Sequence, residues 1–299
     1  MSRHFIQESD VNASEFKDIL KHGITLKKSW QSGTTRDSLH NKTLAMIFEK
    51  ASTRTRTSFS AGMAQLGGHA LDLSPGSSQL GRGEPITDTS RVLSEMVDAV
   101  MMRTYSHQTI VDFSSVSRVP VINGLSDLLH PCQLLADMQT FMELRGDIKG
   151  ARGAWVGAGN NMCNSYIVTA QLLGFTLAIS CPTDVQPDTQ LVASGGAHIE
   201  QCDSAEDACR GADLITTDVW ASMGEEEDGT RLAALLRPYQ VNQSLLQLGA
   251  KDALFMHCLP AHRGEEVTAE VIDGSQSVVW QQAGNRLHAQ KSLLEFLLL

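Results

Sequence analysis

The chain has 299 residues, enough for one large domain or two of ordinary size, and its 42% hydrophobic content is typical of a globular protein with a buried core. Its formal net charge of −10 argues against binding to nucleic acid or to an anionic membrane through a broad basic surface. No apolar run is long enough to span a bilayer, and the charged N-terminal segment lacks the apolar stretch of a secretory signal. We therefore expect a cytoplasmic protein.

In the N-terminal half, short apolar runs alternate with helical patterns. The apolar runs predict strands at Thr43–Phe48, Ala99–Met102 and Val119–Ile122. The helical patterns cover Thr53–Leu66 and Pro131–Leu144, and the proline of the second suits a first helical turn, where its missing N–H costs nothing.

The C-terminal half continues the alternation. Its predicted helices are Asn161–Leu173 and Asp188–Ser194. Its predicted strands are Ala154–Val156, Phe175–Ser180, Ala197–Glu200, Leu214–Thr217, Ala253–His257 and Ser277–Trp280. Strands and helices that alternate at this spacing predict βαβ units and parallel sheets.

We therefore expect an α/β fold made of two doubly wound parallel-sheet domains of similar size, closed by a C-terminal helix. A turn-rich stretch at residues 140–150 suggests the boundary between them. The predicted domains are residues 1–145 and 146–282, with a helix at 283–299 that packs back on the first. The six cysteines contain no CxxC pair, which favours reduced, mostly buried thiols.

The strongest chemical signal follows the first predicted strand. Ser52 can cap the next helix, whose N-terminal N–H groups attract anions. Arg54 and Arg56 add charged, forked donors that suit phosphate oxygens. The segment S-T-R-T-R-T therefore predicts a phosphate site without the glycines of a P-loop, although a capped helix with surface arginines would look alike.

Two further segments carry polar residues at a strand end or a helix start. His130 and Gln133 could donate hydrogen bonds to a carbonyl or carbamoyl group, although His-Pro at a helix start is often a plain turn. Arg103 follows an apolar strand, and parallel sheets bind ligands beyond the carboxyl ends of their strands.

Two loops that follow later predicted strands contain the remaining candidate binding residues. Asp218 could pair with an ammonium group and Ser222 with a carboxylate, although a capping turn would also place them there. Cys258 stands near His257 and His262, which leaves a metal site or a Cys–His nucleophile open. A metal site here would lack a fourth ligand at a suitable spacing, and a Cys–His nucleophile would lack a group that orients the histidine.

Gly157-Ala158-Gly159 resembles half of a dinucleotide-binding fingerprint. The third glycine is replaced by Met162, which argues against a nicotinamide-dependent oxidoreductase.

Taken in order, these segments resemble the aspartate/ornithine carbamoyltransferase family over nearly the whole chain. S-T-R-T-R-T and H-P-x-Q are similar to the carbamoyl phosphate half that the family shares. D-x-x-x-S-M-G and H-C-L-P are similar to the ornithine-specific members. The chain departs from some members at Ala158, where they have Asp, and near Gly83, where they have Lys.

The resemblance implies a role for each matching residue. Carbamoyl phosphate would contact Ser52, Thr53, Arg54, Thr55, Arg103, His130, Gln133, Cys258, Leu259 and Arg286, with Gln79 reaching in from a neighbouring subunit. Ornithine would contact Asn161, Asp218, Ser222 and Met223. The residues expected to act in catalysis are Arg54, Arg103, His130, Cys258 and Arg286.

The resemblance also implies an enzyme that transfers the carbamoyl group of carbamoyl phosphate to the δ-amine of L-ornithine. It implies no cofactor and no metal, and a homotrimer or a multiple of trimers. The sequence does not fix the direction of the reaction in the cell, and a biosynthetic role is the default expectation. Its first domain would bind carbamoyl phosphate and its second ornithine. A carbamoyltransferase for another amine, such as putrescine or an acylated ornithine, and a non-catalytic regulatory homologue remain alternatives.

Overall fold

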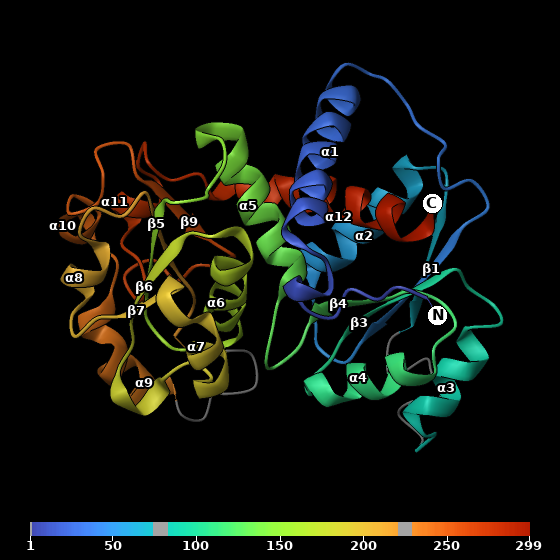
Figure 1. Ribbon diagram of the computed structural model, residues 1–299, viewed down its shortest axis with the longest axis horizontal. Coiled ribbons are helices and arrows are strands. Elements are labelled where there is room, and N and C mark those ends of the chain that lie inside the picture. The colour runs from blue at the N-terminus through green and yellow to red at the C-terminus, as the bar shows by residue number, and fades with distance from the viewer. Residues whose placement is uncertain (1, 74–82, 221–228) are drawn as a thin grey trace. The chain divides into compact units, whose positions relative to one another are not determined.

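The computed structural model describes residues 2–73, 83–220 and 229–299 (Figure 1). Contacts divide the chain into two compact units, Met1–Gln139 with Gly284–Leu299, and Thr140–Ala283. Each unit contains its own parallel sheet with helices around it. The α/β fold with two parallel sheets is therefore confirmed.

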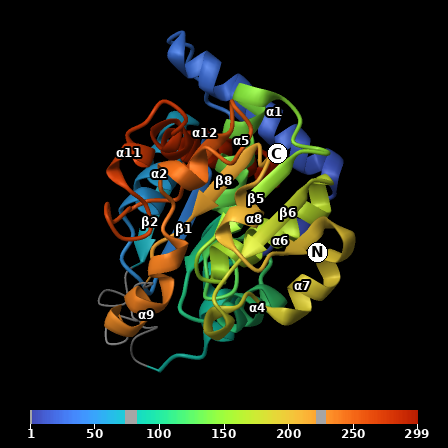
Figure 2. The same ribbon diagram turned by 90° about the vertical axis from the view of Figure 1, so that its left-hand side faces the viewer.

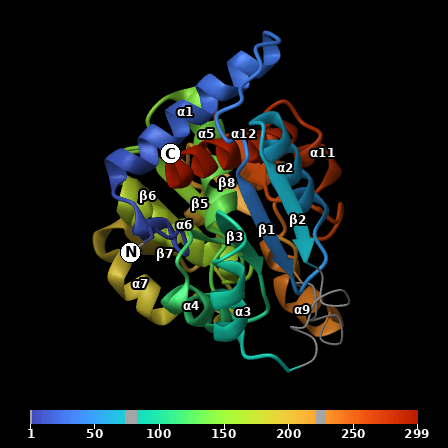
Figure 3. The ribbon, with the colours of Figure 1, turned by 90° about the vertical axis from the view of Figure 1, so that its right-hand side faces the viewer.

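The first unit has a sheet of four parallel strands in the order β2-β1-β3-β4. The strands are β1 (Thr43–Phe48), β2 (His69–Leu73), β3 (Ala99–Arg103) and β4 (Val121–Leu125). β1 and β3 are nearly continuous buried runs, as expected for strands inside a parallel sheet, whereas the edge strand β2, beside β1 in Figure 3, is largely exposed. Phe48 pairs in register with Arg103, so β1 and β3 end together.

The helices around this sheet are η1 (Glu8–Asp10), α1 (Ala13–Gln31), α2 (Thr53–Gln65), α3 (Ile86–Leu93), α4 (His107–Val116), α5 (Pro131–Arg145) and α12 (Val279–Leu298). The start of α1 is fixed by a capping box, in which Asn12 accepts N–H bonds from the first turn and Glu15 accepts the N–H of Asn12. Phe16, Ile19 and Leu26 lie on its buried face.

The second unit has a sheet of five parallel strands in the order β7-β6-β5-β8-β9. The strands are β5 (Arg152–Val156), β6 (Thr176–Ser180), β7 (Ile199–Gln201), β8 (Leu214–Thr217) and β9 (Leu254–His257). The chain runs outward from β5 through β6 to β7 and then returns to β8 on the other side of β5. Figure 2 shows β5 between β6 and β8. The strand order therefore reverses between β5 and β8, which is where doubly wound sheets bind ligands.

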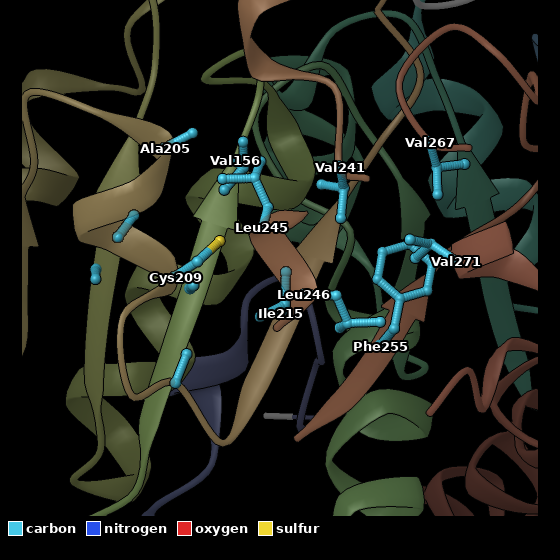
Figure 4. Packing of buried hydrophobic residues seen from close by; sticks show 14 of the residues in the cluster. Val156, Ala205, Cys209, Ile215, Val241, Leu245, Leu246, Phe255, Val267 and Val271 are labelled. Carbon is cyan, nitrogen blue, oxygen red and sulfur yellow. The ribbon is translucent and has the colours of Figure 1, made fainter. Parts of the chain in front are cut away.

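The connecting helices of this unit are α6 (Asn161–Leu173), η4 (Thr183–Val185), α7 (Thr189–Gly195), η5 (Gly196–His198), α8 (Ala205–Cys209), α9 (Gly229–Leu236), η7 (Arg237–Tyr239), α10 (Gln243–Leu246) and α11 (Ala269–Ile272). Figure 4 shows the core that joins several of them to the sheet. Val156, Ile215 and Phe255 from three strands pack with Leu246 of α10 and Val271 of α11, and all are at most 2% exposed. This apolar packing holds the strand ends, and therefore the loops after them, in place.

One predicted strand is wrong. Ser277 forms only an isolated bridge with Phe255, and the chain enters α12 at Val279. A short apolar run such as Val278-Val279-Trp280 cannot be assigned to strand or helix by its pattern alone. Arg286, expected at the start of the last helix, therefore lies two turns inside it. No helix among the described residues is both long and apolar enough to cross a membrane.

Candidate active site

The start of α2 forms the centre of a cluster in the first unit. Ser52 has extended backbone geometry and its Oγ accepts the N–H of Thr55 at 3.3 Å, which caps the helix as the sequence predicts. The helix therefore begins directly after β1, with its positive end at the carboxyl edge of the sheet. Such an end favours a bound anion.

Two buried arginines converge on Thr55. Arg103 ends β3, and its Nη1 lies 3.5 Å from Thr55 Oγ1. Arg286 comes from α12, and its Nη2 donates to the same hydroxyl at 3.0 Å. Both arginine residues are at most 8% exposed, so their positive charges act in a poorly solvated place. A phosphate dianion would relieve the repulsion between them.

Gln133 extends the cluster into α5. Its Oε1 accepts from Nη1 of Arg286 at 2.5 Å, and its Nε2 donates to Asp137 at 2.8 Å. These two bonds fix which end of the amide faces the arginine. Asp137, one turn further along the helix, was not predicted as a site residue, although its i+4 spacing from Gln133 could have indicated the contact.

His130 lies directly before α5 and is only 4% exposed. Burial lowers the pKa of its imidazole well below the usual value, and the charges of Arg286, Arg103 and Arg54 lower this pKa further. His130 is therefore neutral at neutral pH. A neutral imidazole can donate to a carbonyl oxygen without adding another charge.

Arg56 does not belong to this cluster, contrary to its expected role as a phosphate donor. Its guanidinium is ion-paired with Asp72 and stacks over the ring of Phe48 at 4.5 Å. Residues two apart in an α-helix lie about 200° apart around its axis, so Arg54 and Arg56 point in nearly opposite directions and cannot share one ligand face. Of the two arginines in S-T-R-T-R-T, Arg54 therefore belongs to the cluster, whereas Arg56 pairs with Asp72 of β2.

A second cluster lies where the strand order of the second unit reverses. Asn160 caps α6 by accepting the N–H groups of Met162 and Cys163. Its Nδ2 donates to Asp218 Oδ2 at 2.9 Å. Asn160 thus joins the loops after β5 and β8, a role that the sequence analysis missed although an Asn before a helix is a clear capping signal.

Asp218 is the centre of this second cluster and is 8% exposed. Its Oδ1 accepts the N–H of Val219 at 2.8 Å and the thiol of Cys258 at 3.0 Å. Because Asp218 and Cys258 follow the neighbouring strands β8 and β9, parallel pairing brings them together. The arrangement presents a held carboxylate next to a thiol, which suits a cationic amine.

Leu259 has a strained backbone beside this cluster. Its φ of 58° is in the left-handed region that residues other than glycine rarely adopt, and its N–H donates to His257 Nδ1 at 2.9 Å. Strained residues of this kind concentrate at ligand sites.

The segment Gly157-Ala158-Gly159, which resembles half of a dinucleotide-binding fingerprint, is explained by packing. A Cβ at Gly159 would lie 2.0 Å from the backbone nitrogen of Pro187, so only glycine fits there. The glycine therefore gives no support to a dinucleotide.

The structure thus gathers the predicted residues into two groups. The first group contains Ser52, Thr53, Arg54, Thr55, Arg103, His130, Gln133 and Arg286. The second contains Asp218, Cys258 and Leu259, with Asn161 as the first residue of α6. Gln79, Ser222 and Met223 lie outside the described residues.

Family models match both halves of the chain. Residues 3–143 match the carbamoyl-P binding domain, and residues 149–297 the Asp/Orn binding domain, of aspartate/ornithine carbamoyltransferase. The chain belongs to the aspartate/ornithine carbamoyltransferase family. The second family model extends over most of α12, whereas contacts place residues 284–299 with the first unit.

Relatives in this family are similar over their whole length. The ornithine carbamoyltransferase of Methylococcus capsulatus is 56% identical over 99% of this chain and 98% of its own. The anabolic ornithine carbamoyltransferase of Pseudomonas aeruginosa is 54% identical over 99% of this chain and 97% of its own.

Solved structures of ornithine carbamoyltransferases have the same fold as this chain. The ornithine carbamoyltransferase of Burkholderia thailandensis has a TM-score of 0.93 and 49% identity over 99% of both chains. That of Pyrococcus furiosus has a TM-score of 0.95 and 46% identity over 99% of this chain and 97% of its own.

Proposed function

We propose that this protein transfers the carbamoyl group of carbamoyl phosphate to the δ-amine of L-ornithine, giving L-citrulline and phosphate. The observation that carries the proposal is the convergence of Arg103 and Arg286 on Thr55 at the positive end of α2. The full-length similarity to proteins named ornithine carbamoyltransferase supports the choice of acceptor.

Carbamoyl phosphate is assigned to the first domain, residues 1–145 with the helix at 283–299. Its phosphate accepts hydrogen bonds from the N-terminal N–H groups and hydroxyls of residues 52–55, and its charge is met by Arg54, Arg103 and Arg286. The carbamoyl oxygen accepts from the neutral His130. Gln133, whose carbonyl already faces Arg286, uses its second lone pair for the carbamoyl NH₂.

Ornithine is assigned to the second domain, residues 146–282. Asp218 holds the α-ammonium group, since it is a buried carboxylate fixed by Asn160. Asn161, Ser222 and Met223 are assigned to the rest of the amino-acid head on the family resemblance.

The δ-amine must lose a proton before it reacts, because an ammonium group has no lone pair. Its ordinary pKa should be close to that of lysine, about 10.4, and nearby positive charges lower it. Cys258 positions the amine through its thiol, which Asp218 already orients.

The amine then attacks the carbamoyl carbon and forms a C–N bond. Negative charge develops on the carbamoyl oxygen, where Arg103 and His130 stabilise it in a poorly solvated site. The C–O bond to phosphate breaks, and the phosphate leaves with the proton of the amine. Every atom of the products comes from the two substrates, so the reaction needs no redox partner.

The assembly, compartment and direction are also part of the proposal. We propose a homotrimer or a multiple of trimers in which Gln79 completes the site of a neighbouring subunit, on the family resemblance. A cytoplasmic location fits the six cysteines, which form no disulfide in the part of the chain that the structure describes, since thiols persist in reducing compartments. A biosynthetic direction is supported by relatives named anabolic.

The test is carbamoyl transfer from carbamoyl phosphate to four acceptors in parallel: ornithine, putrescine, N-acetylornithine and aspartate. We expect ornithine to be clearly preferred, at a turnover in the ordinary enzymatic range of about 1–1000 per second. Preference for putrescine or N-acetylornithine would assign another acceptor. Absence of transfer by the folded protein would favour a non-catalytic homologue.

A further inference from the structure

The turn between β9 and α11 brings three metal-binding side chains together outside the proposed substrate contacts. His262, Glu265 and Glu266 each offer one ligand atom, and these atoms lie within 4.8 Å of one another. The side chains of His262 and Glu265 are 54% and 56% exposed, whereas Glu266 is fully buried. The group therefore combines two exposed side chains, which can rotate, with one buried carboxylate.

Glu266 is an unusual carboxylate because it is buried with few donors. Its Oε1 accepts the N–H of His262 at 2.6 Å. Its Oε2 has no hydrogen-bond partner among the residues that the structure describes. A buried carboxylate that lacks donors is costly, so this oxygen favours a cation.

The nearest basic side chains do not neutralise Glu266. His257 Nε2 lies 3.2 Å from Glu266 Oε1, but without the alignment of a hydrogen bond. His257 Nδ1 accepts the N–H of Leu259, which requires a lone pair there and makes this imidazole neutral. Arg263, next in sequence to His262, donates instead to Asp273 at 2.8 and 3.1 Å.

We propose that His262, Glu265 and Glu266 bind a divalent transition-metal ion of the zinc or cobalt class. One imidazole and two carboxylates suit such ions, and three protein ligands leave a position for water. Tetrahedral ligands at ordinary metal distances are about 3.3 Å apart, so the exposed side chains of His262 and Glu265 must move inward by rotation.

The site is auxiliary, since none of its ligands contacts a substrate in the proposed reaction. Glu266 Oε1 lies beside His257, which in turn holds Leu259. Metal binding at Glu266 can therefore shift the turn that carries Cys258 through two contacts, from Glu266 to His257 and from His257 to Leu259.

The test is a titration of the full chain, without substrates, with Co²⁺ as the probe, followed by visible absorbance and calorimetry. We expect one Co²⁺ per chain, no thiolate-to-cobalt charge-transfer band, and displacement by Zn²⁺. His262→Ala and Glu265→Gln should each weaken binding by about tenfold or more. His40→Ala is the matched control, because His40 is also an exposed histidine beside an acid, Asp37, at 3.5 Å.

A second group of possible metal ligands must be distinguished from the proposed site. Asp218, His257 and Cys258 also place ligand atoms within 4.8 Å of one another. A thiolate band that disappears in Cys258→Ser, with binding unchanged in His262→Ala, would overturn the proposal. So would the absence of Co²⁺ binding, or equal losses in His262→Ala and His40→Ala. Since no substrate is present, these outcomes are independent of the proposed carbamoyl transfer.

Discussion

Replacing Arg286 by lysine separates the charge of the guanidinium group from its forked shape. The two terminal nitrogens of Arg286 donate to different acceptors, Gln133 Oε1 at 2.5 Å and Thr55 Oγ1 at 3.0 Å. A lysine ammonium keeps the charge but cannot span both acceptors. At least one charged hydrogen bond is therefore lost in a site where Arg286 is only 3% exposed.

The magnitude follows from that loss. A hydrogen bond with a charged partner contributes about 1.5–3 kcal/mol, so Arg286→Lys should lower kcat/KM for carbamoyl phosphate by about 10- to 150-fold. The assay is citrulline formation with carbamoyl phosphate varied at saturating ornithine. The KM for ornithine should change much less, because Asp218 and Cys258 belong to the other cluster.

Arg56→Lys is the matched control, since it makes the same substitution in an arginine of the same motif. Arg56 pairs with Asp72 and its side chain is 42% exposed, so the change should cost less than about 1 kcal/mol, or about fivefold. Wild-type kinetics in Arg286→Lys, or an equal loss in Arg56→Lys, would refute the assignment of Arg286 to the phosphate site.

Three further predictions address the other cluster, the buried histidine and the core. Asp218→Asn should raise the KM for ornithine by about 10- to 150-fold, because a charged hydrogen bond to the substrate is lost. Cys258→Ala should give a smaller rise, since its thiol is hydrogen-bonded to Asp218. Unchanged ornithine kinetics in both variants would contradict the place of Asp218 in the amino-acid site. His130 has a lowered pKa, so the unfolded chain binds its proton first, and the free energy of unfolding should fall as the pH drops below about 6.5 towards the folded pKa. His130→Gln should flatten this slope in chemical denaturation, and an identical slope would contradict the lowered pKa. Phe255→Ala should lower the free energy of unfolding by about 3–5 kcal/mol, since Phe255 is fully buried; a loss below about 1 kcal/mol in urea denaturation would contradict its place in the core.

The sequence predicted the parts of the fold that have a local signature. β1 and β3 are buried on both faces, so their apolar runs stand out, and α2 begins at the predicted capping serine. β2 was missed because it is an edge strand with exposed residues on both sides of its pleat. α1 was missed although Asn12 and Glu15 form a capping box, because its surface is rich in lysine and polar residues.

The candidate site was predictable as a set of residues but not as a set of contacts. The resemblance named Thr55, Gln133 and Arg286, but their hydrogen bonds join α2, α5 and α12, which are far apart in sequence. Arg56 carries the same chemical signal as Arg54, and only the position of Asp72 on the neighbouring strand shows that it serves another purpose. Local sequence patterns do not contain such long-range pairings.

The central claim is tested most directly by measuring citrulline and phosphate together in one reaction of the wild-type protein with carbamoyl phosphate and ornithine. We predict that both products appear at the same rate, one for one, and that omission of ornithine stops phosphate release above the uncatalysed background. Phosphate released without citrulline would mean that the positive cluster at α2 serves hydrolysis rather than transfer, and the absence of both products would contradict the proposed activity.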